Sequence, residues 1–312
     1  MSARVRVALI QARPVYYNLE RTVTKALSLI SEAAGQGAQL AAFGETFFPG
    51  YPAWLDYALD YARWDHPPTK QLYARLVANS LALDSPEMQR LREQAREHEI
   101  VLLLGINERV ASGRGNRSLY NSIVTIDADS AIVNHHRKLR PTYTEQLVWA
   151  QGDGAGLGAV ETAAGRVGGL ICWEHWMPQA RQAMHISNES IHVAMWPAVK
   201  EMHQVASRHY AFEGRTFVLA VGNIMPASDF PAELDLQEDL RAQPDAPLLN
   251  GGSAVIGPDG AYLLEPVYDE ETILYADLDL SRIAEEQMAL DVTGSYARDD
   301  IFTFAINRRR LE

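Results

Sequence analysis

The 312-residue chain is 47% hydrophobic and 22% charged, which excludes a disordered chain, a collagen or a coiled coil and leaves a folded protein with an ordinary core. Its formal net charge of −12 repels nucleic-acid phosphate and anionic lipid, and no apolar stretch approaches the roughly 18 to 20 residues of a membrane-spanning helix. We therefore expect a protein that binds neither nucleic acid nor membrane. A single cysteine cannot form an internal disulfide, so nothing points to an oxidising compartment and we expect a cytoplasmic protein.

The first part of the chain alternates strand and helix. Residues 4–11 alternate in polarity with the period of two that is typical of a strand, and residues 18–34 place apolar side chains at helical spacing. Residues 40–43 form a buried-strand candidate that runs into residues 44–52, which are rich in glycine, proline and aromatic side chains. This segment therefore predicts a loop at the carboxyl end of a strand.

The rest of the chain continues the mixture. Residues 57–83 are predicted to be helical with an interruption near Pro67-Pro68, and Ser85-Pro86-Glu87 opens another helix with Ser85 as its N-cap. A β-meander is predicted over 100–110, 119–126 and 131–138, further strands at 167–171, 191–196, 217–221 and 253–256, and helices at 178–186 and 201–214. Residues 228–249 predict a long surface excursion. The pattern favours an α/β domain with helices covering a sheet.

Several familiar sites are absent from the sequence. There is no His-Glu-x-x-His pattern, one cysteine cannot build a thiolate zinc site, and His135-His136 point to opposite faces of a strand. The glycine run 152–158 lacks the Lys-Ser/Thr of a phosphate loop, and no Gly-x-Ser-x-Gly nucleophile elbow occurs. A metal site, a phosphate loop and a serine hydrolase are therefore not expected.

Cys172 is the first residue with candidate chemistry. It ends the apolar strand 167–171 and is followed at once by Trp173, Glu174 and His175, so its thiol lies where a buried strand becomes a loop. A lone cysteine is more often a small buried apolar residue. The polar and bulky residues after it fit a plain core poorly and favour the wall of a pocket.

Glu45 and Lys138 occupy comparable places. Glu45 comes just after the buried strand 40–43, where a carboxylate is costly unless it is paired or protonated. Lys138 ends the third strand of the predicted meander. A salt-bridged structural glutamate and a solvated surface lysine are the ordinary alternatives, and neither residue is decisive alone.

Together, the surroundings of these three residues resemble the nitrilase branch of the carbon–nitrogen hydrolase superfamily, whose catalytic set is Glu, Lys and Cys in that chain order. The resemblance extends from about residue 4 to about residue 307. Its main blocks are Glu45-Thr46-Phe47-x-Pro49-Gly50-Tyr51-Pro52, His136-Arg137-Lys138-Leu139-x-Pro141-Thr142-x-x-Glu145, and Gly168-x-Leu170-Ile171-Cys172-Trp173-Glu174 with Met177-Pro178.

The resemblance implies a fold and an assembly. The expected fold is a four-layer α-β-β-α sandwich, extended to αββααββα when two protomers stack through their outer helices, with the helix 201–214 as a candidate interface. Residues 1–285 are the expected hydrolase domain, and residues 286–312 a C-terminal segment that packs on the core or on a partner subunit. A homodimer or larger homo-oligomer is expected.

The resemblance also implies a reaction on a small-molecule nitrile. Cys172 attacks the nitrile to give a thioimidate and then a thioester, Lys138 stabilises the anionic nitrogen, and Glu45 moves protons and activates water. The products are the carboxylic acid and ammonia, and neither a metal nor an organic cofactor is needed. Glu145 is expected to orient substrate or Lys138, although Thr142-x-x-Glu145 is also a helix capping box. The backbone N–H of Trp173 is an expected oxyanion donor, and the expected pocket residues are Tyr51, Tyr143, Trp149, His175 and Trp196.

Three other functions stay open at this point. Cys172-Trp173-Glu174 is similar to the nitrile-hydrolysing branch, but an amidase or carbamoylase would use the same three catalytic residues. A cyanide-converting enzyme has similar motifs. A catalytically silent binding protein of the same fold is the non-enzyme alternative.

Overall fold

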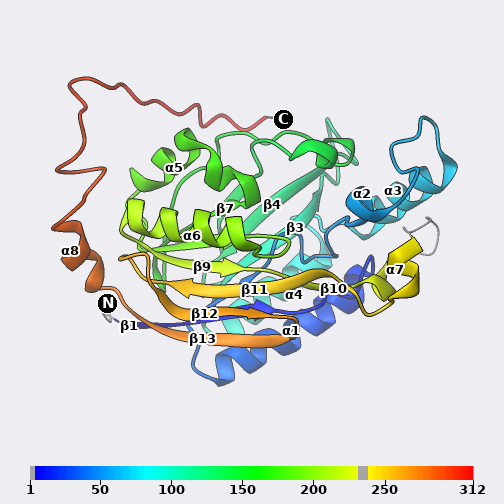
Figure 1. The fold of residues 1–312 in the computed structure, drawn as a ribbon, viewed down its shortest axis with the longest axis horizontal. Coiled ribbons are helices and arrows are strands. Elements are labelled where there is room, and N and C mark those ends of the chain that lie inside the picture. The colour runs from blue at the N-terminus through cyan, green and yellow to red at the C-terminus, as the bar shows by residue number, and fades with distance from the viewer. Residues whose placement is uncertain (1–3, 231–237, 312) are drawn as a thin grey trace.

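The computed structural model describes residues 4–230 and 238–311, and two β-sheets form its centre (Figure 1). Within these residues one sheet has six strands, in the order β13 (Thr272–Asp279), β1 (Arg4–Gln11), β2 (Leu40–Phe43), β3 (Val101–Arg109), β4 (Leu119–Ile126) and β5 (Ile132–Arg137). The other has seven, in the order β10 (Ile224–Pro226), β11 (Pro247–Ile256), β9 (Phe217–Val221), β8 (Ile191–Met195), β7 (Gly165–Ile171) and β6 (Val160–Thr162), with β12 (Tyr262–Tyr268) paired to β11. The predicted β-meander is confirmed as the antiparallel strands β3, β4 and β5.

Helices cover the outer face of each sheet. α1 (Leu19–Gly35) and α4 (Pro86–Glu97) pack on the six-stranded sheet, and α5 (Pro178–His185) and α6 (Glu201–Gly214) pack on the other (Figure 1). The alternation along β1 explains the layering, because Val5, Val7 and Leu9 join a core shared with the second sheet, whereas Ala8 and Ile10 join the core under α1 and α4. The predicted α-β-β-α sandwich is therefore confirmed.

The helix starts follow local sequence signals. The side chain of Ser85 accepts a hydrogen bond from the backbone N–H of Met88 at 3.2 Å, which confirms the predicted N-cap of α4. The prediction of a helix interrupted near Pro67-Pro68 is wrong, because Pro67 begins α3 (Pro67–Asn79). Proline is favoured in the first turn of a helix, where its missing N–H has no intrahelical partner to lose. Only the short α2 (Trp54–Tyr57) precedes it in the segment 51–66.

The remaining elements lie outside the two sheets. They are the 3₁₀ turns η1 (Tyr143–Leu147), η2 (Cys172–Trp176) and η3 (Ala227–Asp229), and the helices α7 (Glu238–Ala242) and α8 (Arg282–Gln287). The predicted surface excursion holds η3 and α7, while its residues 231–237 lie outside the described part of the chain. After α8 an extended segment crosses the upper edge of the molecule in Figure 1. It is tied down near its end by an ion pair of 3.1 Å between Arg310 and Asp153.

Parallel pairing brings the loops after several strands to one edge of the sheets. β1, β2 and β3 are parallel, as are β7, β8 and β9. The loop after β2 reaches across to the second sheet, where the N–H of Glu45 donates to the carbonyl of Trp196 at 3.2 Å. Gly105 of β3 permits this path, since a Cβ there would lie 2.1 Å from the carbonyl oxygen of Gly44.

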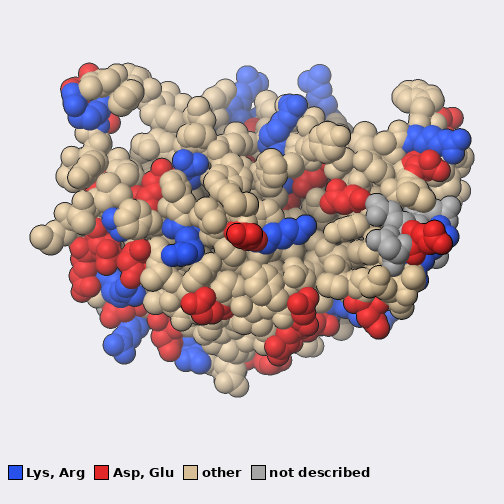
Figure 2. Space-filling model, in the orientation of Figure 1, with Lys and Arg blue, Asp and Glu red and all other residues tan. Residues whose placement is uncertain are grey.

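The surface carries both signs of charge. On the face shown in Figure 2, basic side chains are interspersed with acidic ones. Across residues 4–230 and 238–311, no helix combines the length and apolarity that crossing a membrane requires.

Candidate active site

Three strand ends place the predicted catalytic side chains. Glu45 lies two residues after β2, Lys138 directly after β5, and Cys172 directly after β7. Nζ of Lys138 donates to Oε1 of Glu45 at 2.9 Å, and the charges of both residues act on the Cys172 thiol. All three side chains are buried, with at most 5% of their surface exposed. The structure thus gathers three residues that lie far apart in the sequence into one enclosed cluster.

The carboxyl group of Glu45 has one oxygen held by hydrogen bonds and one oxygen without a described partner. Its Oε1 accepts hydrogen bonds from Lys138 and from Nδ2 of Asn121, the latter at 2.6 Å. Its Oε2 is buried without a hydrogen-bond partner among the described residues. Burial raises the pKa of Glu45 to about 7, although the ammonium of Lys138 opposes the rise. A carboxylate with this pKa can both accept and return a proton near neutral pH.

Lys138 is held between two carboxylates. Its Nζ donates to Glu45 at 2.9 Å and to Oε2 of Glu145 at 2.7 Å. Burial lowers the pKa of the amine, but the two carboxylates outweigh burial and raise the pKa well above its usual value. Lys138 therefore stays a cation, fixed in position within a buried cluster.

Glu145 both caps a 3₁₀ turn and contacts Lys138, the two possibilities that the sequence left open. Its Oε2 accepts a hydrogen bond from the backbone N–H of Thr142 at 2.7 Å, which completes the capping box of η1. The same oxygen accepts from Lys138, and Oε1 accepts from the hydroxyl of Tyr51 at 3.0 Å. The cap thus fixes a carboxylate that in turn orients the lysine.

Cys172 stands on a strained turn. Its φ of 53° is in the left-handed region, which costs a non-glycine residue on the order of 1 kcal/mol and needs support from the surroundings. Burial raises the pKa of the thiol well above its usual value, while the cation of Lys138 and the backbone N–H of Trp173 act in the opposite direction. The thiol is therefore protonated at rest, and a nearby base would have to take its proton before the sulfur could act as a nucleophile.

Glu174 fastens the nucleophile turn to the lysine strand. Its carboxylate accepts hydrogen bonds from the backbone N–H groups of Ile171 at 2.7 Å and Leu139 at 2.8 Å. It also pairs with Nε2 of His136 at 3.0 Å, and these partners lower its pKa. One buried carboxylate thus links the residue before Cys172 with the residue after Lys138.

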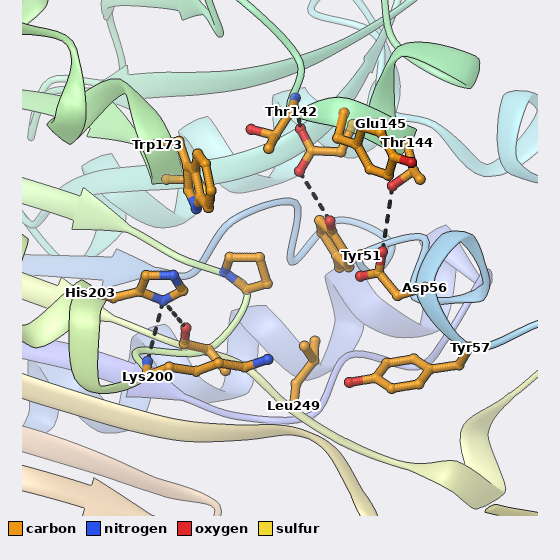
Figure 3. A pocket seen from close by; sticks show the side chains of 14 residues that line it. Tyr51, Asp56, Tyr57, Thr142, Thr144, Glu145, Trp173, Lys200, His203 and Leu249 are labelled. Atoms are coloured by element: carbon orange, nitrogen blue, oxygen red, sulfur yellow. Dashed lines mark hydrogen bonds between the residues drawn. The ribbon is translucent and has the colours of Figure 1, made fainter.

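A cavity of about 660 Å³ opens in front of Cys172. Figure 3 shows Glu145, Tyr51, Trp173 and Lys200 disposed around this space. The described lining consists of Tyr51, Asp56, Tyr57, Thr142, Tyr143, Thr144, Glu145, Cys172, Trp173, Pro197, Ala198, Lys200, His203 and Leu249. Aromatic rings and a few polar groups that converge on a buried cysteine are typical of a small-molecule site.

The predicted pocket residues divide into two groups. Tyr51 and Tyr143 line the cavity, as does Trp173. Trp149, His175 and Trp196 are buried and are not among the residues found to line the cavity, which corrects the expectation. Trp149 donates to Asn107, while His175 and Trp196 stack on each other with ring centroids 4.8 Å apart.

Two asparagines and several cavity residues escaped the sequence analysis. Asn121 donates to the Glu45 side chain, and Nδ2 of Asn223 donates to the Glu45 carbonyl at 2.8 Å. Asn121 could have been found from the sequence, because a polar residue inside the apolar strand 119–126 needs a buried hydrogen-bond partner. Lys200 and His203, at the start of α6, also line the cavity and carry no motif of their own.

The donor set suits acyl chemistry. No group of three or more metal-ligating side chains occurs in the part of the chain that the structure describes. The cluster instead contains a buried thiol that lines the cavity, a carboxyl group of pKa about 7, and an ammonium fixed against Glu145, which also lines the cavity. This set can add a thiol to an electrophilic carbon, stabilise the anion that forms and deliver protons.

Comparisons with known proteins agree with this chemistry. Residues 6–287 match the family described as carbon-nitrogen hydrolase. The chain is 38% identical to an aliphatic nitrilase of Rhodococcus rhodochrous, over 97% of this chain and 83% of that protein. It is 37% identical to an arylacetonitrilase of Aspergillus kawachii, over 98% of this chain and 93% of that protein. Its fold resembles the crystal structure of a carbon-nitrogen hydrolase from Helicobacter pylori, with a TM-score of 0.73, 19% identity and coverage of 96% and 97%.

Proposed function

The chain belongs to the carbon–nitrogen hydrolase family, and on this premise we propose that it is a nitrilase, which converts an organic nitrile and two waters to a carboxylic acid and ammonia. The observation that carries the proposal is the buried set of Glu45, Lys138 and Cys172 beside an aromatic-lined cavity. Relatives named as nitrilases, at 35 to 38% identity over nearly the whole chain, support the nitrile as the substrate class.

The first half-reaction forms a thioimidate. Glu45 takes the proton of the Cys172 thiol, and the sulfur adds to the nitrile carbon. The nitrile nitrogen gains negative charge as the C–S bond forms, and the ammonium of Lys138 stabilises it. Glu45 returns the proton to that nitrogen, so the carboxylate is restored. The free Oε2 of Glu45 is the atom for this transfer, because Oε1 is held by Lys138 and Asn121.

The second half-reaction consumes two waters. Glu45 takes a proton from the first water as that water attacks the thioimidate carbon, and it passes this proton to the nitrogen. Glu45 then moves the hydroxyl proton of the tetrahedral intermediate to the same nitrogen, so the C–N bond breaks, ammonia leaves and a thioester remains. Glu45 then takes a proton from the second water as that water attacks the thioester carbon. The C–S bond breaks and Glu45 gives the proton to the sulfur, which releases the carboxylic acid and restores the thiol. The backbone N–H of Trp173 supports the developing oxyanion. Glu145 acts by holding Lys138 at 2.7 Å.

The same proposal extends to assembly. α5 and α6 form the outer layer of one sheet, and α6 exposes apolar side chains there, with Met202 56% and Phe212 48% exposed. A homodimer through these helices would bury them and give the αββααββα arrangement. Residues 1–285 form the hydrolase domain in this proposal, and residues 286–312 a segment that docks through Arg310. The lone cysteine supports a reducing compartment, the cytoplasm.

Paired substrates test the reaction class. With an aliphatic nitrile, an arylacetonitrile and the amide of each, we expect ammonia release from the nitriles with kcat/KM at least about tenfold above that for the matching amides. The reason is that the cluster carries a linear nitrile through a thioimidate, with Lys138 at the nitrogen. Ammonia release and acid formation are measured together on the purified chain.

Each other outcome selects an alternative. Ammonia from the amides alone would replace the nitrilase with an amidase or carbamoylase. Turnover of hydrogen cyanide but of no organic nitrile would identify a cyanide-converting enzyme. Binding without ammonia from any substrate would leave a silent binding protein.

A further inference from the structure

A chain of buried polar side chains runs from Cys172 away from the cavity. The carbonyl oxygen of Cys172 lies 2.7 Å from Nδ1 of His175, and Nε2 of His175 lies 3.0 Å from Nε2 of His192. Nδ1 of His192 lies 2.9 Å from Oε2 of Glu189, whose Oε1 accepts a hydrogen bond from the hydroxyl of Tyr210. The three linking side chains are at least nine-tenths buried, and the reaction steps given above use none of them.

Every hydrogen bond in this chain must point the same way. A carbonyl oxygen only accepts, so Nδ1 of His175 carries the proton. Burial lowers the pKa of His175 to about 3 and that of His192 well below its usual value, so both rings are neutral. Nε2 of His175 must then accept from Nε2–H of His192, and Nδ1 of His192 must accept in turn. The donor at the end of the chain is therefore the protonated carboxyl of Glu189.

The surroundings of Glu189 favour the proton. Burial raises the pKa of Glu189 to about 7, and its neighbours His185 and Tyr210 oppose the rise. Nδ1 of His185, on α5, lies 3.9 Å from Oε1. Further titratable or charged groups from α5, α6 and η2 act on this cluster, namely Arg181, His203, His209, Glu213 and Glu174.

Ionisation of Glu189 breaks the chain at its middle. A carboxylate can only accept, so His192 would move its proton to Nδ1 and present a bare Nε2 to the bare Nε2 of His175. Two facing lone pairs cannot hydrogen-bond, and the His175 ring loses its support. The Cys172 carbonyl, on a left-handed residue with φ of 53°, then loses a fixed partner.

We propose that Glu189 is a positioning residue for Cys172, acting through His192 and His175, and that its ionisation loosens the nucleophile turn and slows catalysis. The inference rests on the proposed function to the extent that Cys172 is the nucleophile. Activity then falls as the pH rises through the pKa of Glu189, about 7, whereas loss of the Glu45 base lowers activity as the pH falls. The two carboxyls thus set opposite limbs of one pH profile.

Glu189→Gln separates these limbs. A glutamine amide donates to His192 and its oxygen accepts from Tyr210, so the variant keeps the hydrogen-bond chain but cannot ionise. In the unsubstituted protein we expect kcat to be roughly tenfold lower at about pH 8.5 than at about pH 6.5 because of this group. In Glu189→Gln that alkaline fall disappears while the acidic limb stays. Glu161→Gln, which removes an exposed carboxylate on β6, is the matched control and keeps both limbs.

Tyr210→Phe gives a second, directional readout. The hydroxyl of Tyr210 stabilises the ionised form of Glu189, so its removal raises the pKa of Glu189 and moves the alkaline limb to higher pH. A purely structural role of Glu189 would change stability without moving the pH profile. If the alkaline fall of activity stays at the same pH in both Glu189→Gln and Tyr210→Phe, the proposal is wrong.

A spectroscopic measurement makes the test independent of nitrile turnover. Long-range ¹H–¹⁵N spectra of the histidine-labelled chain report which nitrogen of each ring carries the proton. We expect His192 to change from the Nε2–H to the Nδ1–H form between about pH 6 and pH 8.5, and to keep Nε2–H throughout in Glu189→Gln. If the protonated nitrogen of His192 stays the same across this pH range in the unsubstituted protein, the proposed hydrogen-bond chain is refuted, even if the nitrilase activity is confirmed. A changing His192 in a protein without nitrile turnover upholds the hydrogen-bond chain and rejects the proposed function alone.

Discussion

Glu45→Gln should lower kcat for nitrile hydrolysis by about 10³-fold, because an amide cannot take the proton of the Cys172 thiol or of the attacking water. The fold should remain near normal, since glutamine has the same shape and its oxygen can still accept the hydrogen bonds of Lys138 and Asn121. Ammonia release measures the loss, and thermal unfolding checks the fold. The acidic limb near pH 7 should vanish with the residue, because burial raises the pKa of Glu45 to that value.

The control for this change is Glu161→Gln, whose carboxylate is exposed and pairs with Arg166 at the surface. It should retain the activity and both limbs of the pH profile. A Glu45→Gln protein that keeps a substantial part of its turnover would remove Glu45 from the role of base.

Lys138→Met should slow thioimidate formation by about 10²- to 10³-fold, because the developing charge on the nitrile nitrogen loses its fixed cation. It should also reduce the free energy of unfolding by about 3 kcal/mol, since Glu45 and Glu145 would be left as buried carboxylates without their shared partner. Removing the cation raises the pKa of Glu45 further, so any residual activity should shift to higher pH. Single-turnover kinetics measure the first effect and urea unfolding the second.

Lys25→Met is the matched control, because Lys25 also forms a lysine–glutamate pair, of 2.6 Å with Glu271, but at the surface. Surface pairs contribute little, so stability should change by less than about 1 kcal/mol and turnover should stay the same. Equal effects of the two substitutions would show that Lys138 has no special place in the reaction.

The sequence allowed the strand ends of the site to be predicted, but not their meeting. Apolar runs before Glu45 and Cys172 predicted that each residue follows a buried strand, and β2 and β7 confirm those strands. Nothing in periodicity brings positions 45, 138 and 172 together. Only the family resemblance implied that these three residues lie together. The ion pair of 2.9 Å between Lys138 and Glu45 shows that two of them are in direct contact.

The parts that sequence reasoning missed depend on side-chain direction. Trp196 was expected in the pocket, yet it lies in the core, where its ring stacks on His203 at 4.2 Å and its Nε1 donates to Ser207. Large aromatic residues occupy cores and pocket walls alike, so residue type alone does not separate the two. The hydrogen bonds of Glu174 to two backbone N–H groups were equally invisible, because they join loops that the sequence separates.

Rapid-quench mass spectrometry of the intact chain offers the most direct test of covalent catalysis at Cys172. Mixed with an excess of nitrile and stopped in acid within the first turnover, the protein should gain the mass of the thioimidate or thioester. Peptide mapping should place the added mass on Cys172, and Cys172→Ala should gain none. An equal mass gain on Cys172→Ala, or steady ammonia release from that variant, would contradict the account.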